Sequence, residues 1–197
     1  MKVIGLCGGS GSGKGFIGKM FLSLDIPTID TDKVYHELIS KKSDCTLALI
    51  DEFGTDILNP DGSVSRPALR SLVFSHGTRE RLNRLNEITH KFILNKTEEL
   101  IKEYERLGKK AVIIDAPLLF ESGFNQKCDI IILVTAEREV RIKRIMERDL
   151  ITREAAERRI DSQLSDELLK ERVDIVIDNS HDGDAALKKV VEISKRI

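Results

Sequence analysis

The chain has 197 residues, 41% of them hydrophobic, which is enough for one compact domain with a buried core. Its 32 lysines and arginines nearly balance its 33 aspartates and glutamates, leaving a formal net charge of −1. So small a net charge argues against a nucleic-acid partner bound through overall positive charge, and any site for anions must be local.

The sequence shows no sign of export or membrane insertion. No apolar run approaches the ~20 residues that a membrane-spanning helix needs, and Met1-Lys2 leads straight into a strand pattern rather than a signal peptide. The three cysteines, Cys7, Cys45 and Cys128, are odd in number and lack metal-binding spacing. We therefore expect free thiols in a reducing compartment, and a cytoplasmic protein with no membrane partner.

The first predicted element is a short apolar strand, Val3–Cys7, followed by the glycine-rich segment Gly8–Gly15 and a helical pattern over Phe16–Leu24. This is the context of a Gly-x-x-x-x-Gly-Lys phosphate-binding loop, although a glycine-rich turn without chemistry is the alternative. Backbone N–H groups and the positive end of the helix bind polyphosphate in such loops, and Lys14 would reach the β- and γ-phosphates. The predicted nucleotide-binding residues here are Gly9, Ser10, Gly11, Ser12, Gly13, Lys14, Gly15 and Phe16.

Position 15 departs from the motif. A Ser or Thr normally follows the lysine and its hydroxyl binds Mg²⁺, whereas Gly15 and then Phe16 follow here. Ser10 or Ser12 would replace that hydroxyl only if the loop geometry shifted. The sequence therefore predicts ATP and Mg²⁺ as cofactors but leaves the metal short of one ligand.

The second predicted strand, Ile26–Ile29, is weaker and leads into Asp30-Thr31-Asp32. One strand-end carboxylate is placed to accept a proton from an attacking hydroxyl, and the other to ligate or orient Mg²⁺. The alternative is that these aspartates cap a helix that begins near Lys33. A cap and a catalytic role are compatible, and we predict functional roles for both Asp32 and Asp30.

Residues 33–107 break the alternation of strands and helices. They are mainly helical, with a turn at Asn59–Gly62 and a long helix predicted over Leu82–Leu107. Such a length is too great for a plain crossover and predicts a helical subdomain inserted at the carboxyl edge of the sheet. From composition alone, His90 in this insertion is more often structural than functional.

Three more apolar runs, Ala111–Ile114, Asp129–Val134 and Val173–Ile177, predict further strands, and Asp184–Ile197 predicts a final helix. The fold class is therefore α/β with a doubly wound parallel sheet. Asp115 follows the first of these runs, as in a Walker B motif that holds Mg²⁺ directly or through water; the alternative is an aspartate that only closes the turn before Pro117.

The segment from Arg138 to Arg172 is basic, with helices predicted over Glu137–Arg148 and Arg153–Lys170. Arg141, Arg144 and Arg148 share a helix face at spacings of three and seven. One planar guanidinium group can bind two phosphoryl oxygens at once, so Arg144 and Arg148 are predicted to act on the nucleotide. For most other arginines in the segment we favour a solvated face paired with neighbouring glutamates.

Several motifs in this order resemble the dephospho-coenzyme A kinase family over most of the chain. Beside the glycine loop and Asp30-Thr31-Asp32, they are Arg66–Phe74, Leu85–His90, Asp115–Glu121, the lid segment from Arg144 through Gln163, and Asp174–Asn179. A phosphate-binding loop alone is only moderately specific. The Leu-Asn-x-Ile-x-His and Pro-Leu-Leu-Phe-Glu segments in this order are much more so.

The resemblance implies a P-loop NTPase with three α/β/α layers, built as a single domain over residues 1–197. Its core would be 1–32, 108–137 and 173–197, with a helical coenzyme A-binding insertion at 33–107 and a lid at 138–172. The implied reaction transfers the ATP γ-phosphate to the 3′-hydroxyl of dephospho-CoA. We expect a monomer or small homo-oligomer.

The resemblance also implies roles for residues. Asp32, Lys14 and Arg144 would be catalytic, with Asp32 as general base, and Asp32 and Asp115 would hold the metal, partly through water. The expected substrate-binding residues are Asp32, Arg66, Asn86, His90 and Asp115.

The chain departs from the family pattern in three places. Gly15-Phe16 stands for the usual Ser-Thr, Lys91 for a proline, and Tyr35-His36 for Ala-Arg. Two alternatives therefore stay open: another P-loop nucleoside or nucleotide kinase, and a catalytically impaired homologue that binds nucleotide or coenzyme A.

Overall fold

The computed structural model describes residues 1–74, 79–117, 119–181 and 183–197. These form two compact units: the first is Met1–Ile29 with Glu103–Ile197, and the second is Asp30–Lys102. Each unit has a hydrophobic core of its own. The finer division into core, insertion and lid stays a prediction.

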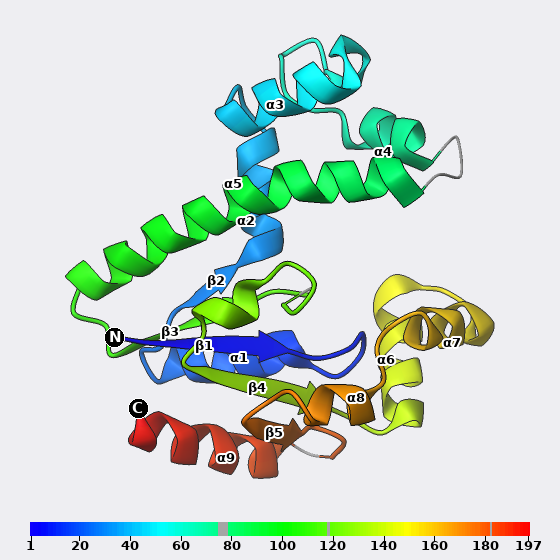
Figure 1. Ribbon diagram of the computed structural model, residues 1–197. Coiled ribbons are helices and arrows are strands. Elements are labelled where there is room, and N and C mark those ends of the chain that lie inside the picture. The colour runs from blue at the N-terminus through cyan, green and yellow to red at the C-terminus, as the bar shows by residue number, and fades with distance from the viewer. Residues whose placement is uncertain (75–78, 118, 182) are drawn as a thin grey trace. The chain divides into compact units, whose positions relative to one another are not determined.

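The first unit is built on a five-stranded sheet with the order β2-β3-β1-β4-β5 (Figure 1). Strand β1 is parallel to β3 and β4, and β4 is parallel to β5. The predicted α/β fold with a parallel sheet is confirmed, and the predicted strand ends differ by one or two residues. The strands are β1 (Lys2–Cys7), β2 (Thr28–Asp30), β3 (Ala111–Asp115), β4 (Ile130–Thr135) and β5 (Ile175–Asp178).

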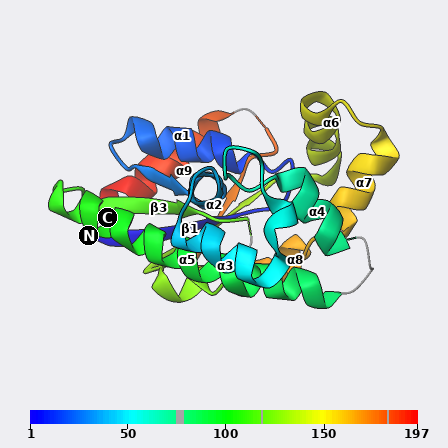
Figure 2. The ribbon, with the colours of Figure 1, turned by 90° about the horizontal axis from the view of Figure 1, so that it is seen from above.

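Helices α1 (Lys14–Ser23) and α9 (Gly183–Arg196) lie side by side on one face of this sheet (Figure 2). The core between them joins Ile4 of β1 with Ile17 of α1 and Val190 of α9, all fully buried. Because side chains alternate along a strand, Gly5 faces the other side of the sheet, where Leu119 and Cys128 pack against it. Helices therefore flank the sheet as the α/β expectation required.

The carboxyl ends of parallel strands share one edge of a sheet, which is where α/β proteins bind ligands. At this edge β1 leads into the glycine loop, β3 ends at Asp115, β4 leads toward α6, and β5 is followed by Asn179. The topology therefore gathers the predicted phosphate loop, the strand-end carboxylate and the basic segment.

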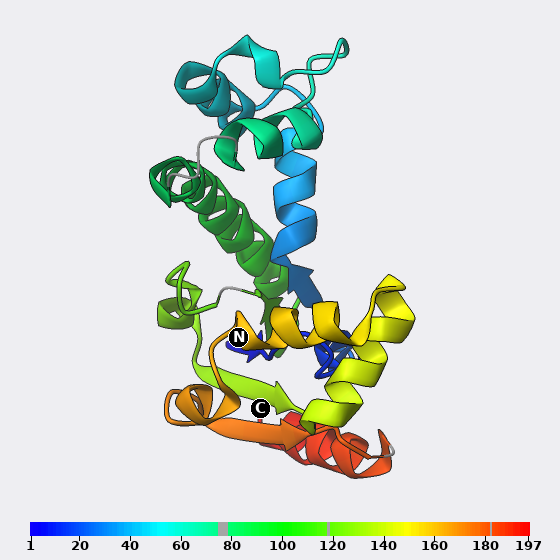
Figure 3. The ribbon, with the colours of Figure 1, turned by 90° about the vertical axis from the view of Figure 1, so that its right-hand side faces the viewer.

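The basic segment forms a helical hairpin of α6 (Arg138–Asp149) and α7 (Arg153–Asp161), in yellow in Figure 3. Ile142 and Ile145 of α6 pack with Ala156 of α7 in a small cluster of their own. The predicted single helix over Arg153–Lys170 is wrong. Helix α7 ends at Asp161, and a separate short helix, α8 (Asp166–Lys170), follows.

The physical reason for this break lies in serine hydroxyls that bond to nearby backbone. Ser165 accepts a hydrogen bond from the N–H of Leu168 and so caps α8, while Ser162 Oγ donates to the carbonyl of Arg159. Such local bonds compete with helix continuation.

The second unit is helical, as expected. Its elements are α2 (Thr31–Ile39), α3 (Asp44–Phe53), the short η1 (Thr55–Ile57), α4 (Arg66–Phe74) and most of α5 (Arg79–Arg106). Leu49, Ile57 and Val73 are buried at its centre. Among the described residues, no helix is both long enough and apolar enough to cross a bilayer.

Candidate functional site

The glycine loop turns sharply between β1 and α1. Gly11 and Gly13 have φ of 79° and 89°, in the left-handed region that only glycine adopts at little cost. Space is also limited, because a Cβ added to Gly11 would lie 2.6 Å from the carbonyl oxygen of Arg141. Conformation and close packing therefore both require glycine at position 11.

Donors from two other parts of the chain bind the carbonyl oxygens of this loop. Arg141 Nε lies 2.9 Å from the oxygen of Ser10, and Asn179 Nδ2 lies 2.8 Å from that of Ser12. Arg144 Nη1 approaches the oxygens of Gly11 and Ser12 at 3.3 and 3.4 Å. One side of the loop is thus covered by hydrogen-bond donors.

Lys14 begins α1 and pairs its ammonium group with Oδ1 of Asp115 at the end of β3. Both side chains are 16% exposed, so the pair is partly shielded from water but accessible from one direction. A phosphate or a cation that reaches this point meets both charges. The predicted lysine and strand-end carboxylate are therefore brought together.

Position 15 presents no side chain to this site. Gly15 is exposed, and a Cβ added there would meet no atom of the described residues within 4 Å beyond its immediate chain neighbours. Phe16 is 49% exposed, and its ring lies close to Gly183 at the start of α9. Ser12 Oγ is buried without a hydrogen-bond partner among the described residues, and its replacement of the missing hydroxyl stays a prediction.

These residues fit a magnesium ion only if it arrives with a nucleotide. Within the described ranges, no group of three or more His, Cys, Asp or Glu residues could hold a metal. Mg²⁺ commonly keeps several waters and binds through one or two carboxylates together with substrate phosphates. Asp115, beside the glycine loop, suits that mode of binding.

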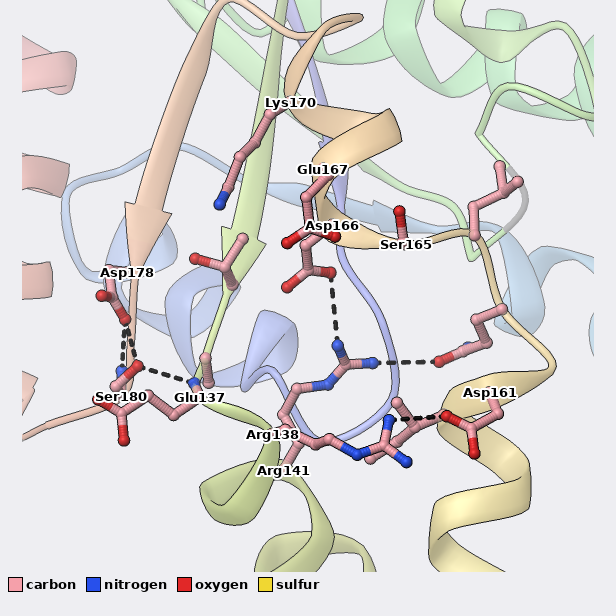
Figure 4. A pocket seen from close by; sticks show the side chains of 15 residues that line it. Glu137, Arg138, Arg141, Asp161, Ser165, Asp166, Glu167, Lys170, Asp178 and Ser180 are labelled. Atoms are coloured by element: carbon pink, nitrogen blue, oxygen red, sulfur yellow. Dashed lines mark hydrogen bonds and ion pairs between the residues drawn. The ribbon is translucent and has the colours of Figure 1, made fainter.

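The arginines on α6 differ in their surroundings. Arg141 is 7% exposed and lines a cavity of about 560 Å³, where Nη1 lies 3.4 Å from Asp166 (Figure 4). The side chain of Arg148 is 60% exposed and pairs with Asp149 at 2.8 Å. Arg148 and Arg159 lower the pKa of the Asp149 carboxyl to about 2.

The glutamate pairing expected for the other arginines is present at Arg153, which bonds Glu139 at 2.6 Å and Glu157 at 2.8 Å.

The remaining predicted residues lie in the second unit. Asp30 caps α2 by accepting the N–H of Lys33 at 3.1 Å, so the capping alternative is correct for Asp30. Asp32 is exposed in the first turn of α2, where its charge complements the positive end of the helix.

The residues predicted to bind the acceptor are on α4 and α5. Arg66 is the first residue of α4 and is exposed. Asn86 and His90 are four residues apart on α5, hence on one helix face. Burial lowers the pKa of the half-buried His90 imidazole.

Three residues that bind the loop were not among the predicted site residues: Arg141, Gln163 and Asn179. Gln163 Oε1 accepts the N–H of Ser10 at 2.9 Å. Asn179 directly follows β5 at the carboxyl edge, the same signal that led to Asp115. For Arg141 the only signal in the sequence was its helical spacing to Arg144, because the burial of its side chain is known only from the structure.

A parallel sheet whose first strand leads through a glycine loop and a lysine into a helix defines a P-loop nucleotide-binding protein. Within that class, residues 2–185 match the family model described as dephospho-CoA kinase. The chain belongs to the dephospho-CoA kinase family. The resemblance drawn from the motifs is confirmed, and with it the prediction of an ATP-dependent kinase.

Curated relatives match nearly the whole chain. The dephospho-CoA kinase of Fusobacterium nucleatum is 38% identical over 195 residues, covering 99% of this chain and 98% of that protein. The dephospho-CoA kinase of Dehalococcoides mccartyi is 39% identical over 180 residues, covering 91% and 89%.

Solved structures are also similar to this chain over nearly its full length. A crystal structure from Thermus thermophilus has a TM-score of 0.81 at 28% identity, covering 99% of this chain and 96% of that one. Dephospho-CoA kinase from Campylobacter jejuni has a TM-score of 0.73 at 26% identity, covering 100% and 97%. Shikimate kinase from Acinetobacter baumannii, at 16% identity and a TM-score of 0.54, shares the P-loop kinase fold.

Proposed function

We propose that this protein transfers the γ-phosphate of ATP to the 3′-hydroxyl of dephospho-CoA, giving coenzyme A and ADP. The observation that carries the proposal is the glycine loop with its Lys14–Asp115 pair, in a chain that matches the family over residues 2–185. Membership of this family favours it over a nucleoside or nucleotide kinase.

The nucleotide is bound by the loop. Loop amides within Gly9–Gly15 that are not bonded inside the protein, together with the ammonium of Lys14, hold the phosphates, while Arg144 offers a guanidinium where charge develops on the transferring group. Phosphoryl transfer needs little covalent help from the protein, so positioning and charge stabilisation supply most of the rate. Phe16 and Arg148 complete the proposed nucleotide contacts.

The acceptor is activated by a carboxylate. Asp32 takes the proton of the 3′-hydroxyl as that oxygen attacks the γ-phosphorus, and the proton remains on Asp32 until ADP and product leave. Arg66, Asn86 and His90, together with Asp115, bind dephospho-CoA.

The proposed Mg²⁺ is held by Asp32 and Asp115, partly through water, together with the nucleotide phosphates. Bound there, it would neutralise charge on the phosphate oxygens.

A second candidate function is nucleotide and coenzyme A binding without efficient transfer. Gly15 favours it, because the residue after Lys14 offers no hydroxyl to the metal and no neighbouring side chain fills the space. This candidate predicts that both ligands bind while turnover stays low.

One assay separates the candidates. ADP release is measured with ATP, Mg²⁺ and dephospho-CoA, beside adenosine as acceptor and a mixture without acceptor. Release that depends on dephospho-CoA supports the kinase, and release with adenosine alone would favour a nucleoside kinase. Binding of ATP and dephospho-CoA without ADP release would favour the impaired homologue.

A further inference from the structure

Two buried side chains outside the proposed nucleotide contacts bind the backbone of the glycine loop. Arg141 is 7% exposed and Asn179 is 3% exposed. Arg141 Nε donates to the carbonyl of Ser10 at 2.9 Å, and Asn179 Nδ2 donates to the carbonyl of Ser12 at 2.8 Å. Both therefore bind carbonyl oxygens, whereas a phosphate would bind the loop through N–H groups.

Peptide geometry connects these two sets of groups. In a trans peptide the carbonyl of one residue and the N–H of the next point in opposite directions. The carbonyl of Ser10 shares its peptide with the N–H of Gly11, and the carbonyl of Ser12 shares its peptide with the N–H of Gly13. A donor that holds either carbonyl on one side of the loop thereby directs the following N–H to the other side.

The geometry points to Arg141 and Asn179 as positioning residues, which hold these carbonyls so that the amides of Gly11 and Gly13 face the nucleotide phosphates. Neither side chain needs to touch the nucleotide. This inference deepens the proposed function, on which it rests for the assignment of the loop as the nucleotide site.

The guanidinium of Arg141 is itself fixed in orientation. Its two terminal nitrogens lie 3.4 Å from Asp166 and from Gln163, and Gln163 also accepts the N–H of Ser10 at 2.9 Å. Burial raises the pKa of the Asp166 carboxyl, and the charge of Arg141 opposes that rise. A group held on several sides loses little freedom when its partner binds a ligand.

Asn179 is fixed in a similar way through its backbone. Its N–H donates to the carbonyl of Thr135 in β4 at 2.9 Å, and its carbonyl accepts Nη2 of Arg144 at 2.8 Å. The loop carbonyls are therefore tied to the end of the sheet at Asn179 and to α6 at Arg141.

Equilibrium binding of ADP and of pyrophosphate tests the inference, because neither ligand requires an acceptor and pyrophosphate has no base. Arg141→Met and Asn179→Ala remove the donors. Arg138→Met is the matched control for Arg141, since Arg138 lies on the same helix and pairs with Asp161 at 2.7 Å (Figure 4). Asn95→Ala, at an exposed position of α5, is the control for Asn179.

We expect Kd for both ligands to rise roughly tenfold or more in Arg141→Met, which loses a charged donor, and roughly threefold to tenfold in Asn179→Ala, which loses a bond between neutral groups. The controls should stay within about twofold of the parent. Arg141→Lys keeps one donor and should recover part of the affinity. In turnover, KM for ATP should rise while KM for dephospho-CoA stays unchanged, which a general loss of structure would not produce.

Folded Arg141→Met and Asn179→Ala proteins that bind ADP and pyrophosphate like the parent would overturn the inference, as would equal losses in the controls. If Arg141→Met does not fold, Asn179→Ala decides by the same criterion. A parent protein that binds ADP but does not phosphorylate dephospho-CoA would contradict the proposed function alone.

Discussion

The glycine loop in the first unit and the predicted acceptor residues in the second hold their side chains differently. Around the loop, Arg141 is buried, Lys14 and Arg144 are partly buried, and all three are bonded to Asp115 or to backbone carbonyls. In the second unit, Asp32 and Arg66 are exposed at helix starts.

This contrast separates two ways in which a substitution acts. Near the loop, loss of one side chain releases several hydrogen bonds, so nucleotide affinity and folding stability should fall together. On an exposed helix start, loss of a carboxylate should affect the chemistry with little effect on stability.

The largest effect is expected for Asp32→Asn. Loss of the proposed base should lower kcat about 10²–10⁴-fold, while ATP affinity and the free energy of unfolding change little. Steady-state kinetics, ATP titration and denaturant unfolding measure the three quantities. Asp44→Asn is the control, since Asp44 is exposed in the first turn of α3 in the same unit. Unchanged kcat in Asp32→Asn would remove Asp32 as the base.

Arg144→Met and Arg148→Met compare two arginines of α6 that differ in burial. Arg144 bonds the loop carbonyls and the carbonyl of Asn179, so its loss should weaken ATP binding about tenfold or more and lower Tm. Arg148 is exposed and pairs with Asp149, so its loss should weaken ATP binding only a few-fold at unchanged Tm. An equal fall in Tm in both variants would contradict the prediction that the more buried arginine contributes more to stability.

Gly15→Ser tests the missing hydroxyl. The open space at position 15 accepts a side chain without strain, and the added oxygen can bind Mg²⁺, so the Mg²⁺ concentration for half-maximal turnover should fall about threefold to tenfold. Gly15→Ala adds the same Cβ without the oxygen and should leave that concentration unchanged. An equal response in both variants would attribute the effect to the helix and not to the metal.

Gly18→Ala should stabilise the first unit without changing the site. Gly18 is buried in α1, and an added Cβ would lie 3.8 Å from Thr28 Oγ1, an ordinary contact. Replacing a helical glycine by alanine should raise the free energy of unfolding by about 0.5–1 kcal/mol. Denaturant unfolding measures this gain, and ADP affinity should be unchanged. A loss of stability would show that the space beside α1 is smaller than the contacts indicate.

The smallest effect concerns pH. Burial lowers the pKa of His90 below its ordinary value of 6.5, so the unfolded chain takes up this proton first as pH falls. His90 therefore costs no stability above pH 6.5 and reduces stability as pH falls below that value toward its folded pKa. Tm measured between neutral and mildly acid pH should fall less in His90→Gln than in the parent. The exposed His181→Gln is the control.

Much of the fold follows from local pattern. The run Val3–Cys7 and the glycines after it determine a strand, a turn and a helix start, and the structure places each within one or two residues. The break before α8 was missed because an apolar helical pattern continues through Ser162 and Ser165, whose hydroxyls bond to backbone instead.

The site was predictable to the extent that it depends on strand ends and motifs, as for Lys14 and Asp115. Arg141 was not predictable, because its helical spacing is that of any surface arginine and its burial depends on the packing of its guanidinium near Gly9, Gln163 and Asp166. Asn179 carried a strand-end signal, but a neutral amide has no chemistry that would distinguish it from a turn residue.

The close approach of α6 to the loop also limits which pairs of substitutions can compensate for one another. At Gly9 the obstacle to a methyl group is the guanidinium of Arg141, so a shorter residue at position 141 would make room for alanine. At Gly11 the obstacle is the backbone of Arg141, which every amino acid shares. No second change at position 141 can therefore compensate for a side chain at position 11.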